Sequence, residues 1–453
     1  MDGLTRRARL ARSRLYFVTE AVPEELLDAA LRGGVDIVQL RDKSLRDDEL
    51  VAAAEPFRRA CERHGALFVL NDRPDLVERC GADGVHVGQD DTPVAEARRI
   101  VGADRLVGLS THSREQILDA DGADSIGVGT IFSTPTKPDN DTAGLELVRT
   151  ARYAATLPWF AIGGIDGANV DEVVANGANG IAVVRAIRDS VDPEGAARAL
   201  RDALPPVAAV VTDGDVRIPQ LDWLRSTNGQ AAPHVHDEHA DVFFLLDGTL
   251  EFRAGDGTVR LPAGSCFAAP PRFVHGFRNP AEDDAQYLNI HAPGGWSRAP
   301  KGLSDTFGVD HGSSEPRPVV TAPGDGDRLT KPHRLAVVRV DLPQLAVVDT
   351  FVDAGFEGPE YHVHLRHADA FLVLEGALEF RLETGTQRVE AGTAVVVPPG
   401  VPHTFRLASE RARYLNVHAP GLGFVDYVRA ADHGEQLPFD QYPAPHSALI
   451  GQP

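Results

Sequence analysis

Two cations and an amide follow one apolar run near the start of the chain. Gln39, Arg41 and Lys43 stand two residues apart at the end of the β-prone run 35–40. At the end of a strand this spacing directs the three side chains the same way, because successive residues alternate faces. Two positive charges and an amide donor on one side suit a polyanionic ligand. The alternative is a solvated strand end that carries two surface cations.

Polar groups also follow the later apolar runs of residues 1–205. Asn71 and Asp72 come after one run, and Asp91 comes after the next. Two carboxylates from adjacent strand ends could share Mg2+, which prefers oxygen ligands. The alternative is that each aspartate caps a helix. Further cations, hydroxyl groups and a glycine for close backbone approach follow later runs: Ser110, Thr134, Thr136, Lys137, Gly164, Val184 and Arg185. Together these groups describe a site for a diphosphate with its metal and for a second phosphate.

The elements that would position these groups alternate between two patterns. Short β-prone runs occur at 15–19, 35–40, 66–70, 84–87, 106–109, 125–128, 159–162 and 180–184. Segments between them, such as 47–64 and 169–176, carry Ala, Leu, Glu and Arg at helical spacing. Eight strand–helix units predict a (β/α)8 TIM barrel, in which functional groups gather at the C-terminal ends of the strands. An open doubly wound sheet is the alternative.

Six short motifs stand in order at the predicted strand ends: 39–43, 71–72, 86–91, 108–112, 134–137 and 162–165. With them, residues from about 14 to 204 resemble thiamine phosphate synthase. The resemblance implies an enzyme of thiamine biosynthesis, a transferase that joins an aminopyrimidine diphosphate to a thiazole (carboxylate) phosphate. The products would be thiamine phosphate and pyrophosphate. A thiazole tautomerase of the same fold is the alternative, and the complete set of cations and carboxylates favours the synthase.

The resemblance also implies a role for each matching residue. The residues that would hold the pyrimidine diphosphate are Gln39, Arg41, Lys43, Asn71, Ser110 and Lys137, among which the catalytic ones would be Arg41, Lys43, Ser110 and Lys137. The residues that would hold the thiazole phosphate are Thr134, Thr136, Gly164, Val184 and Arg185. Asp72 and Asp91 would bind Mg2+. The family usually has Ser where Arg185 stands, and we expect His86 to be a structural strand residue.

The second half of the chain contains a duplicated domain. Segments 234–241, 244–253 and 287–294 match 362–369, 372–381 and 414–421 in nearly constant register. Gly, Pro and short alternating strands predict two all-β domains after the barrel. The predicted boundaries are 1–205 for the barrel, 206–300 and 333–435 for the two copies, 301–332 for a linker, and 436–453 for a loosely packed tail.

Each copy carries His-x-His, then an acidic residue, then a later His. His-x-His on a strand points both imidazoles to one face, as a metal site requires. These motifs resemble those of bicupins, which are paired double-sheet jelly rolls, with Asp where Glu is usual. The resemblance implies two ligand sets: His234, His236, Asp241 and His275, then His362, His364, Asp369 and His403. The metal in one or both copies would be Fe, Mn, Ni, Zn or Cu. The alternative is that these histidines pack without a metal.

The bicupin half permits three readings of its function. It could be a metal-dependent enzyme that acts on a small molecule, a ligand-binding module, or a structural half that dimerises. His239 and His367 are additional histidines that could be residues at the rim of the barrel or alternative ligands.

The length, charge and cysteine content of the chain limit the cellular compartment and the classes of binding partner that we expect. At 453 residues the chain should contain two to four domains. A net charge of −21 argues against general nucleic-acid binding. The basic N-terminus lacks the apolar core of a secretory signal, and no apolar run is long enough for a membrane span. Three cysteines without a C-x-x-C pair favour a reducing compartment. We therefore expect a cytoplasmic protein with small-molecule substrates, and a homo-oligomer is compatible with this reading.

Overall fold

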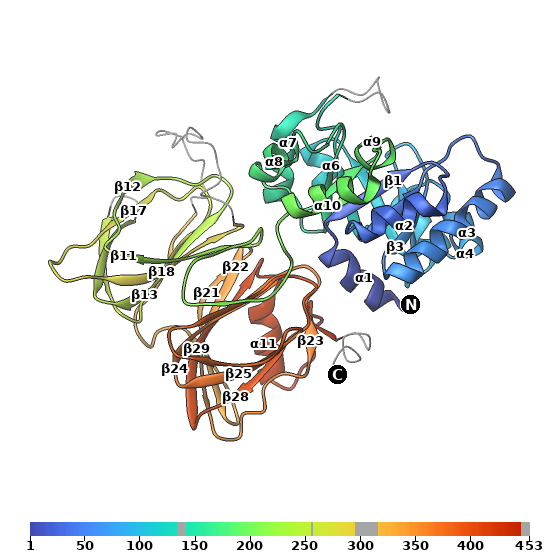
Figure 1. Ribbon diagram of the computed structural model, residues 1–453. Coiled ribbons are helices and arrows are strands. Elements are labelled where there is room, and N and C mark those ends of the chain that lie inside the picture. Colours follow the sequence, from blue (N-terminus) through green and yellow to red (C-terminus); the bar gives the residue numbers. More distant parts are fainter. Residues whose placement is uncertain (134–141, 255–256, 295–315, 445–453) are drawn as a thin grey trace. The chain divides into compact units, whose positions relative to one another are not determined.

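The computed structural model describes residues 1–133, 142–254, 257–294 and 316–444 (Figure 1). It divides the chain into two compact units, Met1–Val207 and Ala208–Pro453. The division falls next to the predicted end of the barrel at residue 205. Three groups of predicted residues lie outside the described ranges. They are the barrel-site residues Thr134, Thr136 and Lys137, a part of the predicted linker, and residues 445–453 of the predicted tail.

The first unit is a closed parallel barrel whose strands pair in chain order, with β1 pairing β8. This closure excludes the open sheet. The strands are β1 (Leu15–Thr19), β2 (Ile37–Leu40), β3 (Leu67–Asn71), β4 (Gly84–Val87), β5 (Leu106–Thr111), β6 (Ser125–Val128), β7 (Trp159–Ile162) and β8 (Ile181–Val183). Figure 1 shows the helices around them. The helices are α1 (Gly3–Arg12), α2 (Glu24–Arg32), α3 (Asp47–His64), α4 (Val77–Cys80), α5 (Val94–Val101), α6 (Arg114–Leu118), α7 (Gly144–Ala154), α8 (Val170–Ala175), α9 (Arg185–Arg188) and α10 (Pro193–Ala203), with the 3-10 turn η1 (Pro74–Leu76) before α4.

The barrel strands are buried on both faces, because one face meets the helices and the other fills the barrel. In β1, Leu15 and Phe17 pack with the outer core, whereas Tyr16 and Val18 pack inside with Phe160 and other strand residues. Alternation along each strand therefore separates a helix-facing core from a barrel-filling core.

The N-terminal helix closes the barrel at the end opposite the predicted site. Arg6 pairs with Asp83 at 2.8 Å, and Arg7 pairs with Asp124 at 2.8 Å. These aspartates directly precede β4 and β6, so they mark the N-terminal ends of the strands. Leu10 of α1 joins the barrel-filling core. Ligands must therefore approach from the C-terminal ends of the strands.

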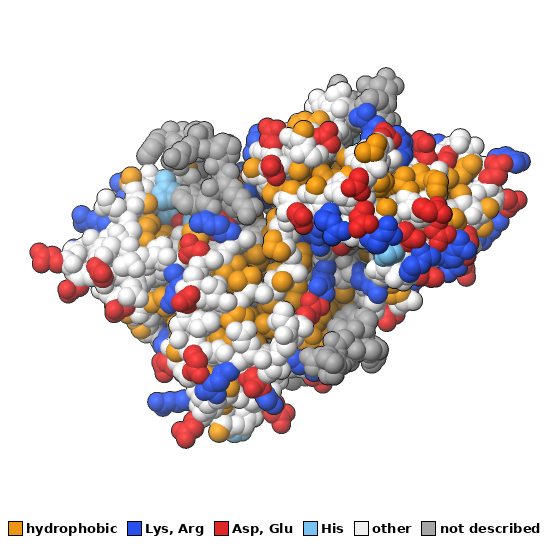
Figure 2. All heavy atoms as spheres, in the orientation of Figure 1, with side chains coloured by type: hydrophobic (Ala, Val, Ile, Leu, Met, Phe, Trp, Pro, Cys, Tyr) orange, Lys and Arg blue, Asp and Glu red, His pale blue; other side chains and the backbone are white. Residues whose placement is uncertain are grey.

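Charged side chains of both signs are interspersed over the visible face of the barrel helices (Figure 2). Arg63 of α3, for example, pairs with Glu24 at 2.7 Å and with Asp28 at 2.5 Å, both on α2. Ion pairs of this kind cover the surface without building a field of one sign. Among the described residues, no helix combines the length and the apolar character that crossing a bilayer would need.

The second unit contains two copies of an antiparallel double-sheet fold. In the first copy, a six-stranded sheet (β10-β11-β18-β13-β16-β19) faces a four-stranded sheet (β12-β17-β14-β15). Its strands are β10 (Val216–Arg217), β11 (Asp222–Thr227), β12 (Ala231–His234), β13 (Ala240–Asp247), β14 (Thr249–Ala254), β15 (Gly257–Pro262), β16 (Cys266–Ala269), β17 (His275–Arg278), β18 (Gln286–Ala292) and β19 (Val319–Thr321).

The second copy repeats this plan with a seven-stranded sheet (β20-β21-β22-β29-β24-β27-β9) and smaller sheets β26-β25-β28 and β23-β30. Its elements are β9 (Val210–Thr212), β20 (Asp327–Lys331), β21 (Arg334–Leu342), β22 (Leu345–Asp353), β23 (His362–Val363), β24 (Ala368–Glu375), β25 (Ala377–Leu382), β26 (Gly385–Glu390), β27 (Ala394–Val397), β28 (Thr404–Leu407), β29 (Arg411–Ala419), α11 (Phe424–Asp432) and β30 (Tyr442–Pro443). Helix α11 lies in a part of the chain that was expected to be all-β.

The two copies exchange edge strands and share a core. β9, which precedes the first copy in sequence, pairs with β27 of the second copy. β19, which follows the first copy, pairs back onto β16. One apolar cluster contains Trp223 and Val242 of the first copy together with Val347 of the second. Part of the predicted linker 301–332 is therefore strand, since it contains β19 and β20.

The prediction of a loosely packed tail is wrong for residues 440–443. Asp440 is buried, and β30 pairs with β23. The Pro- and Gln-containing composition suggested a loose segment, but these residues pack against a strand that lies far away in the sequence.

Candidate functional site

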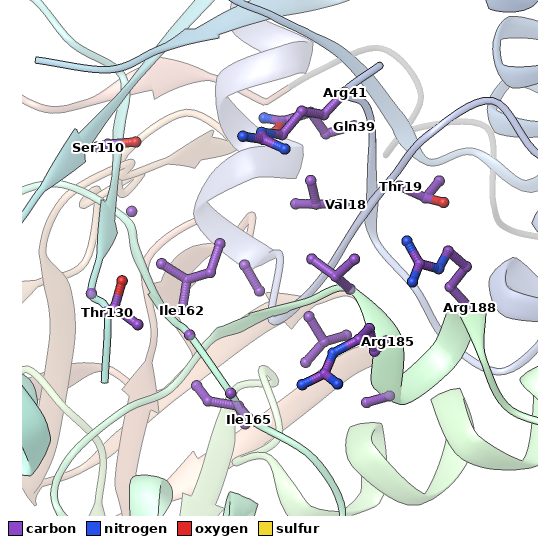
Figure 3. A pocket seen from close by; sticks show the side chains of 18 of the residues that line it. Val18, Thr19, Gln39, Arg41, Ser110, Thr130, Ile162, Ile165, Arg185 and Arg188 are labelled. Atoms are coloured by element: carbon purple, nitrogen blue, oxygen red, sulfur yellow. The ribbon is translucent and has the colours of Figure 1, made fainter. Parts of the chain in front are cut away.

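A cavity of about 400 Å³ lies at the C-terminal ends of the barrel strands (Figure 3). Seven of the predicted barrel-site residues line it: Gln39, Arg41, Asn71, Ser110, Gly164, Val184 and Arg185. They come from β2 and the residue that follows it, from β3 and β5, from the turns after β7 and β8, and from the start of α9. The predicted strand ends therefore converge on one space, as the barrel topology requires.

Gln39 fixes one wall of the cavity. Its Nε2 donates a hydrogen bond to the hydroxyl oxygen of Tyr16, at 2.9 Å, and Gln39 is only 3% exposed. Burial raises the pKa of Tyr16, so this phenol stays protonated. Figure 3 places Arg41 beside Gln39. The wall thus presents the guanidinium of Arg41 near a neutral, hydrogen-bonded pair.

Lys43, Asp72 and Asp91 form a charged group beside this wall. Lys43 Nζ lies 3.2 Å from Asp72 Oδ2, which also accepts a hydrogen bond from Asn71 Nδ2 at 2.6 Å. Burial is the main cause that raises the pKa of Asp72; Lys43 lowers it, and the neighbouring charge of Asp91 raises it again. Asp72 also has a φ of 60°, which is uncommon for a residue other than Gly. Two adjacent carboxylates fit a divalent cation, which would offset the negative charge of both.

The side chain of His86 reaches the cavity. Its Nε2 lies 3.0 Å from Ser110 Oγ, and both residues line the cavity. The expectation that His86 is a structural strand residue rather than a catalyst stays a prediction, although its side chain lines the cavity. The period of two along β4 could have revealed it, because Val85 and Val87 pack in the outer core and leave His86 facing inward.

Two further cations that line the cavity, Arg185 and Arg188, both come from α9. Arg188 pairs with Asp189 at 2.7 Å. Sequence reasoning missed Arg188, although it follows Arg185 by three residues on α9 and so shares its helix face. Val18, Ile162 and Ile165 add apolar surface to the cavity. The site thus offers cations at two places with apolar walls.

The bicupin unit brings both predicted ligand sets together. In each set, four donor atoms lie within 4.8 Å of one another: His234, His236, Asp241 and His275, then His362, His364, Asp369 and His403. The Nε2 atoms of the His-x-His pair are 3.1 Å apart in each copy. The later His lies 3.1 Å from the Asp carboxylate in the first copy and 3.2 Å in the second.

Backbone carbonyls set the tautomer of several candidate ligand histidines. His362 Nδ1 lies 2.7 Å from the Glu360 carbonyl oxygen, and His403 Nδ1 lies 3.2 Å from that of Val401. His234 and His275 have equivalent contacts at 2.8 and 3.0 Å. A ring that donates through Nδ1 leaves Nε2 unprotonated and able to bind a metal. Burial, with nearby His403 and His364, lowers the pKa of His362 to about 3, so this ring is neutral at physiological pH.

The shorter acid also fits the site. Asn416 Nδ2 donates to Asp369 Oδ1 at 2.5 Å, which leaves Oδ2 facing His403 at 3.2 Å and His364 at 3.6 Å. Burial tends to raise the pKa of Asp369, but the surrounding histidines hold it well below its usual range. Three imidazoles and one carboxylate therefore converge in each copy, and this donor set suits a transition metal.

Additional histidines adjoin each ligand set. His239 and His291 lie with His236, and His367 and His418 lie with His364, in groups whose donor atoms are also within 4.8 Å. His291 and His418 were not predicted as site residues. The sequence could have indicated them, because His291 and His418 occupy matching positions in the two copies.

Comparisons with known proteins divide the chain as its sequence does. Residues 15–187 match the family model Thiamine monophosphate synthase, and residues 226–291 and 350–418 match Cupin domain. Thiamine-phosphate synthase of Saccharopolyspora erythraea is 50% identical over 208 residues, which cover 43% of this chain and 93% of that protein. The chain belongs to the thiamine-phosphate synthase family.

Other members of the thiamine-phosphate synthase family differ in length. The Gloeobacter violaceus protein is 49% identical over 191 residues, which cover 41% of this chain but only 56% of that relative. The chain thus spans little more than half of this relative. A solved structure, thiamine phosphate pyrophosphorylase from Pyrococcus furiosus, has 34% identity and a TM-score of 0.40, covering 44% of this chain and 96% of its own.

Proposed function

We propose that the barrel is a thiamine phosphate synthase. It would condense an aminopyrimidine diphosphate with a thiazole (carboxylate) phosphate, giving thiamine phosphate and pyrophosphate. One observation carries the proposal: a single cavity has Arg41 at one wall, Arg185 and Arg188 at another, and a carboxylate pair beside the first. Two anionic substrates with flat apolar rings match this arrangement of charge and surface.

The diphosphate would lie at the wall of Gln39 and Arg41. Asn71, Ser110, Lys43 and Lys137 would complete its binding site, with Asp72 and Asp91 as ligands of Mg2+. The thiazole phosphate would lie near Thr134, Thr136, Gly164, Val184 and Arg185.

The chemistry requires that charge on the leaving diphosphate be neutralised. Bound Mg2+ would supply part of this neutralisation. Arg41, Lys43 and Lys137 would stabilise the negative charge that grows as the C–O bond breaks. The thiazole nitrogen would then capture the pyrimidine-stabilised cation. Val18 and Ile162 would exclude water from this cation.

The test combines both substrates with Mg2+ and the full-length protein. We expect thiamine phosphate and pyrophosphate in equal amounts. If thiamine phosphate does not form while the thiazole carboxylate is isomerised, the barrel is a tautomerase and the proposal fails.

For the bicupin unit, we propose that both copies bind a transition metal through their three histidines and one aspartate. The converging Nε2 atoms, with Nδ1 bound to backbone carbonyls, support this proposal. Full-length protein purified without chelators should contain Fe, Mn, Ni, Zn or Cu. The double variant His362→Ala/His364→Ala should lose the metal that the second copy binds. Metal-free protein that also takes up no added metal would contradict the proposal and leave the ligand-binding and structural readings.

A further inference from the structure

The segment before β30 supplies a buried carboxylate to the histidine cluster of the second copy. Asp440 is 3% exposed. Its carboxylate accepts hydrogen bonds from the backbone N–H of Leu365 at 3.2 Å and of Arg366 at 2.7 Å. Phe439, its neighbour, packs against His367 with ring centroids 5.1 Å apart. These contacts fix Asp440 against the loop that follows the His-x-His motif.

Asp440 contacts one proposed metal ligand directly. The Nδ1 of His364 lies 2.5 Å from the backbone carbonyl oxygen of Asp440. A carbonyl can only accept, so Nδ1 carries the proton, and Nε2 is the atom that faces His362. The carbonyl thus sets both the tautomer and the orientation of His364.

Asp440 also reaches a second proposed ligand through a series of side chains. Its Oδ2 lies 2.9 Å from His367 Nδ1, and His367 Nε2 lies 2.9 Å from His418 Nδ1. His418 Nε2 lies 3.0 Å from Asn416 Oδ1, and Asn416 Nδ2 donates to Asp369 Oδ1. A series of polar contacts of hydrogen-bond length therefore connects Asp440 with the carboxylate of Asp369.

The first copy repeats only part of this series. His291 Nε2 lies 2.8 Å from Asn289 Oδ1, and Asn289 Nδ2 donates to Asp241. His239 stands where the second copy has His367. Its Nε2 is buried and has no hydrogen-bond partner among the residues that the structure describes. Among the described residues, the first copy thus lacks a counterpart to the contact between His367 Nε2 and His418 Nδ1.

We propose that Asp440 is a positioning residue for the metal site of the second copy. It orients His364 through its carbonyl and Asp369 through His367, His418 and Asn416, while binding no metal itself. This inference rests on the proposed metal binding by the bicupin unit. Residues that orient metal ligands in this way contribute about 10- to 100-fold to metal affinity.

The test uses full-length protein with the first copy inactivated by His234→Ala/His236→Ala. Co2+ is titrated against a competing chelator, and bound Co2+ is followed by its visible absorption. Asp440→Ala in this background should weaken Co2+ binding about 10- to 100-fold. Glu435→Ala, which removes an exposed carboxylate five residues earlier, should bind like the background protein. In the opposite background, His362→Ala/His364→Ala, Asp440→Ala should leave Co2+ binding by the first copy unchanged.

The outcomes separate the two proposals. If the background protein with intact Asp440 binds no Co2+, metal binding by the second copy fails. If it binds and Asp440→Ala binds equally well, the positioning role is overturned. Equal weakening of both copies also overturns it, because a general loss of structure would act on both. If Asp440→Ala does not fold, Asp440→Asn decides, since it keeps the size of the side chain but removes the carboxylate that contacts His367; an unchanged Kd for that variant overturns the role.

Discussion

The ammonium nitrogen of Lys43 lies 3.2 Å from Oδ2 of Asp72. The Lys43 side chain is 62% exposed, and a pair this accessible contributes only about 0.2–1 kcal/mol to stability. The contact joins a proposed diphosphate-binding cation to a proposed Mg2+ ligand. We therefore expect the contact between Lys43 and Asp72 to matter for ligand binding rather than for stability, because it holds both side chains in place at the rim of the barrel.

Removing either cation beside the proposed diphosphate site should impair coupling and leave the fold intact. Arg41→Ala and Lys43→Ala should each lower kcat/KM about 10²–10³-fold, because each removes charge that stabilises the leaving group. Steady-state formation of thiamine phosphate measures this. Arg46→Ala, an exposed cation three residues after Lys43, is the matched control and should retain activity. Near-normal turnover of both variants would place the diphosphate elsewhere.

The carboxylate pair should control the requirement for Mg2+. Asp72→Asn and Asp91→Asn should each raise the Mg2+ concentration for half-maximal rate by about tenfold or more, equivalent to at least about 1.4 kcal/mol. Asp90→Asn changes the adjacent exposed carboxylate and should leave the Mg2+ dependence unaltered. An unchanged Mg2+ profile in Asp72→Asn and Asp91→Asn would assign the metal to other residues.

Arg185 should act on the thiazole phosphate rather than on the diphosphate. Arg185→Ser, which restores the usual residue of the family, should raise KM for the thiazole phosphate about tenfold and change kcat little, since a charge-assisted hydrogen bond contributes about 1.5–3 kcal/mol. The kinetics are measured with each substrate varied in turn. Arg198→Ala on α10 is the exposed control. A rise in KM for the pyrimidine diphosphate alone would exchange the two binding regions.

The three cysteines should be unreactive in the native protein. Cys61, Cys80 and Cys266 are all buried. Burial raises the pKa of Cys80 to about 11 and that of Cys266 to about 12, and it also raises the pKa of Cys61. A thiol with a raised pKa stays protonated until the pH approaches that value, so little thiolate exists at pH 8. A colorimetric disulfide reagent at about pH 8 should label no cysteine rapidly before unfolding and all three afterwards. Fast labelling of the native protein would contradict this.

Local sequence was enough for most of the barrel. Helix α3 was predicted at its observed bounds, because its apolar face is continuous and Gly65, at a φ of 72°, ends it. β2 begins at Ile37 instead of residue 35, since Asp36 uses its carboxylate to accept the backbone N–H groups of Arg14 and Leu15. That contact depends on a strand that is not adjacent in sequence, so the run of apolar residues alone could not reveal it.

The site shows the same limit. Gln39, Arg41 and Ser110 could be placed because barrel topology gathers the strand ends. Asp440 could not, because its partners His364 and His367 lie more than 70 residues earlier and meet it only through the pairing of β30 with β23. Repetition could expose His418, but a carboxylate that occurs once leaves no such signal.

The exchanged strands β9 and β19 bear on how this chain can be taken apart. A cut between residues 295 and 315 would strip the second copy of β9 and the first copy of β19, leaving an unpaired sheet edge on each. The sequence contains the motif twice, yet neither copy has a complete sheet without a strand from outside its own segment. The chain therefore has two units that a gene rearrangement could separate: the barrel and the pair of jelly rolls. One jelly roll alone would expose an unpaired sheet edge and be prone to aggregation.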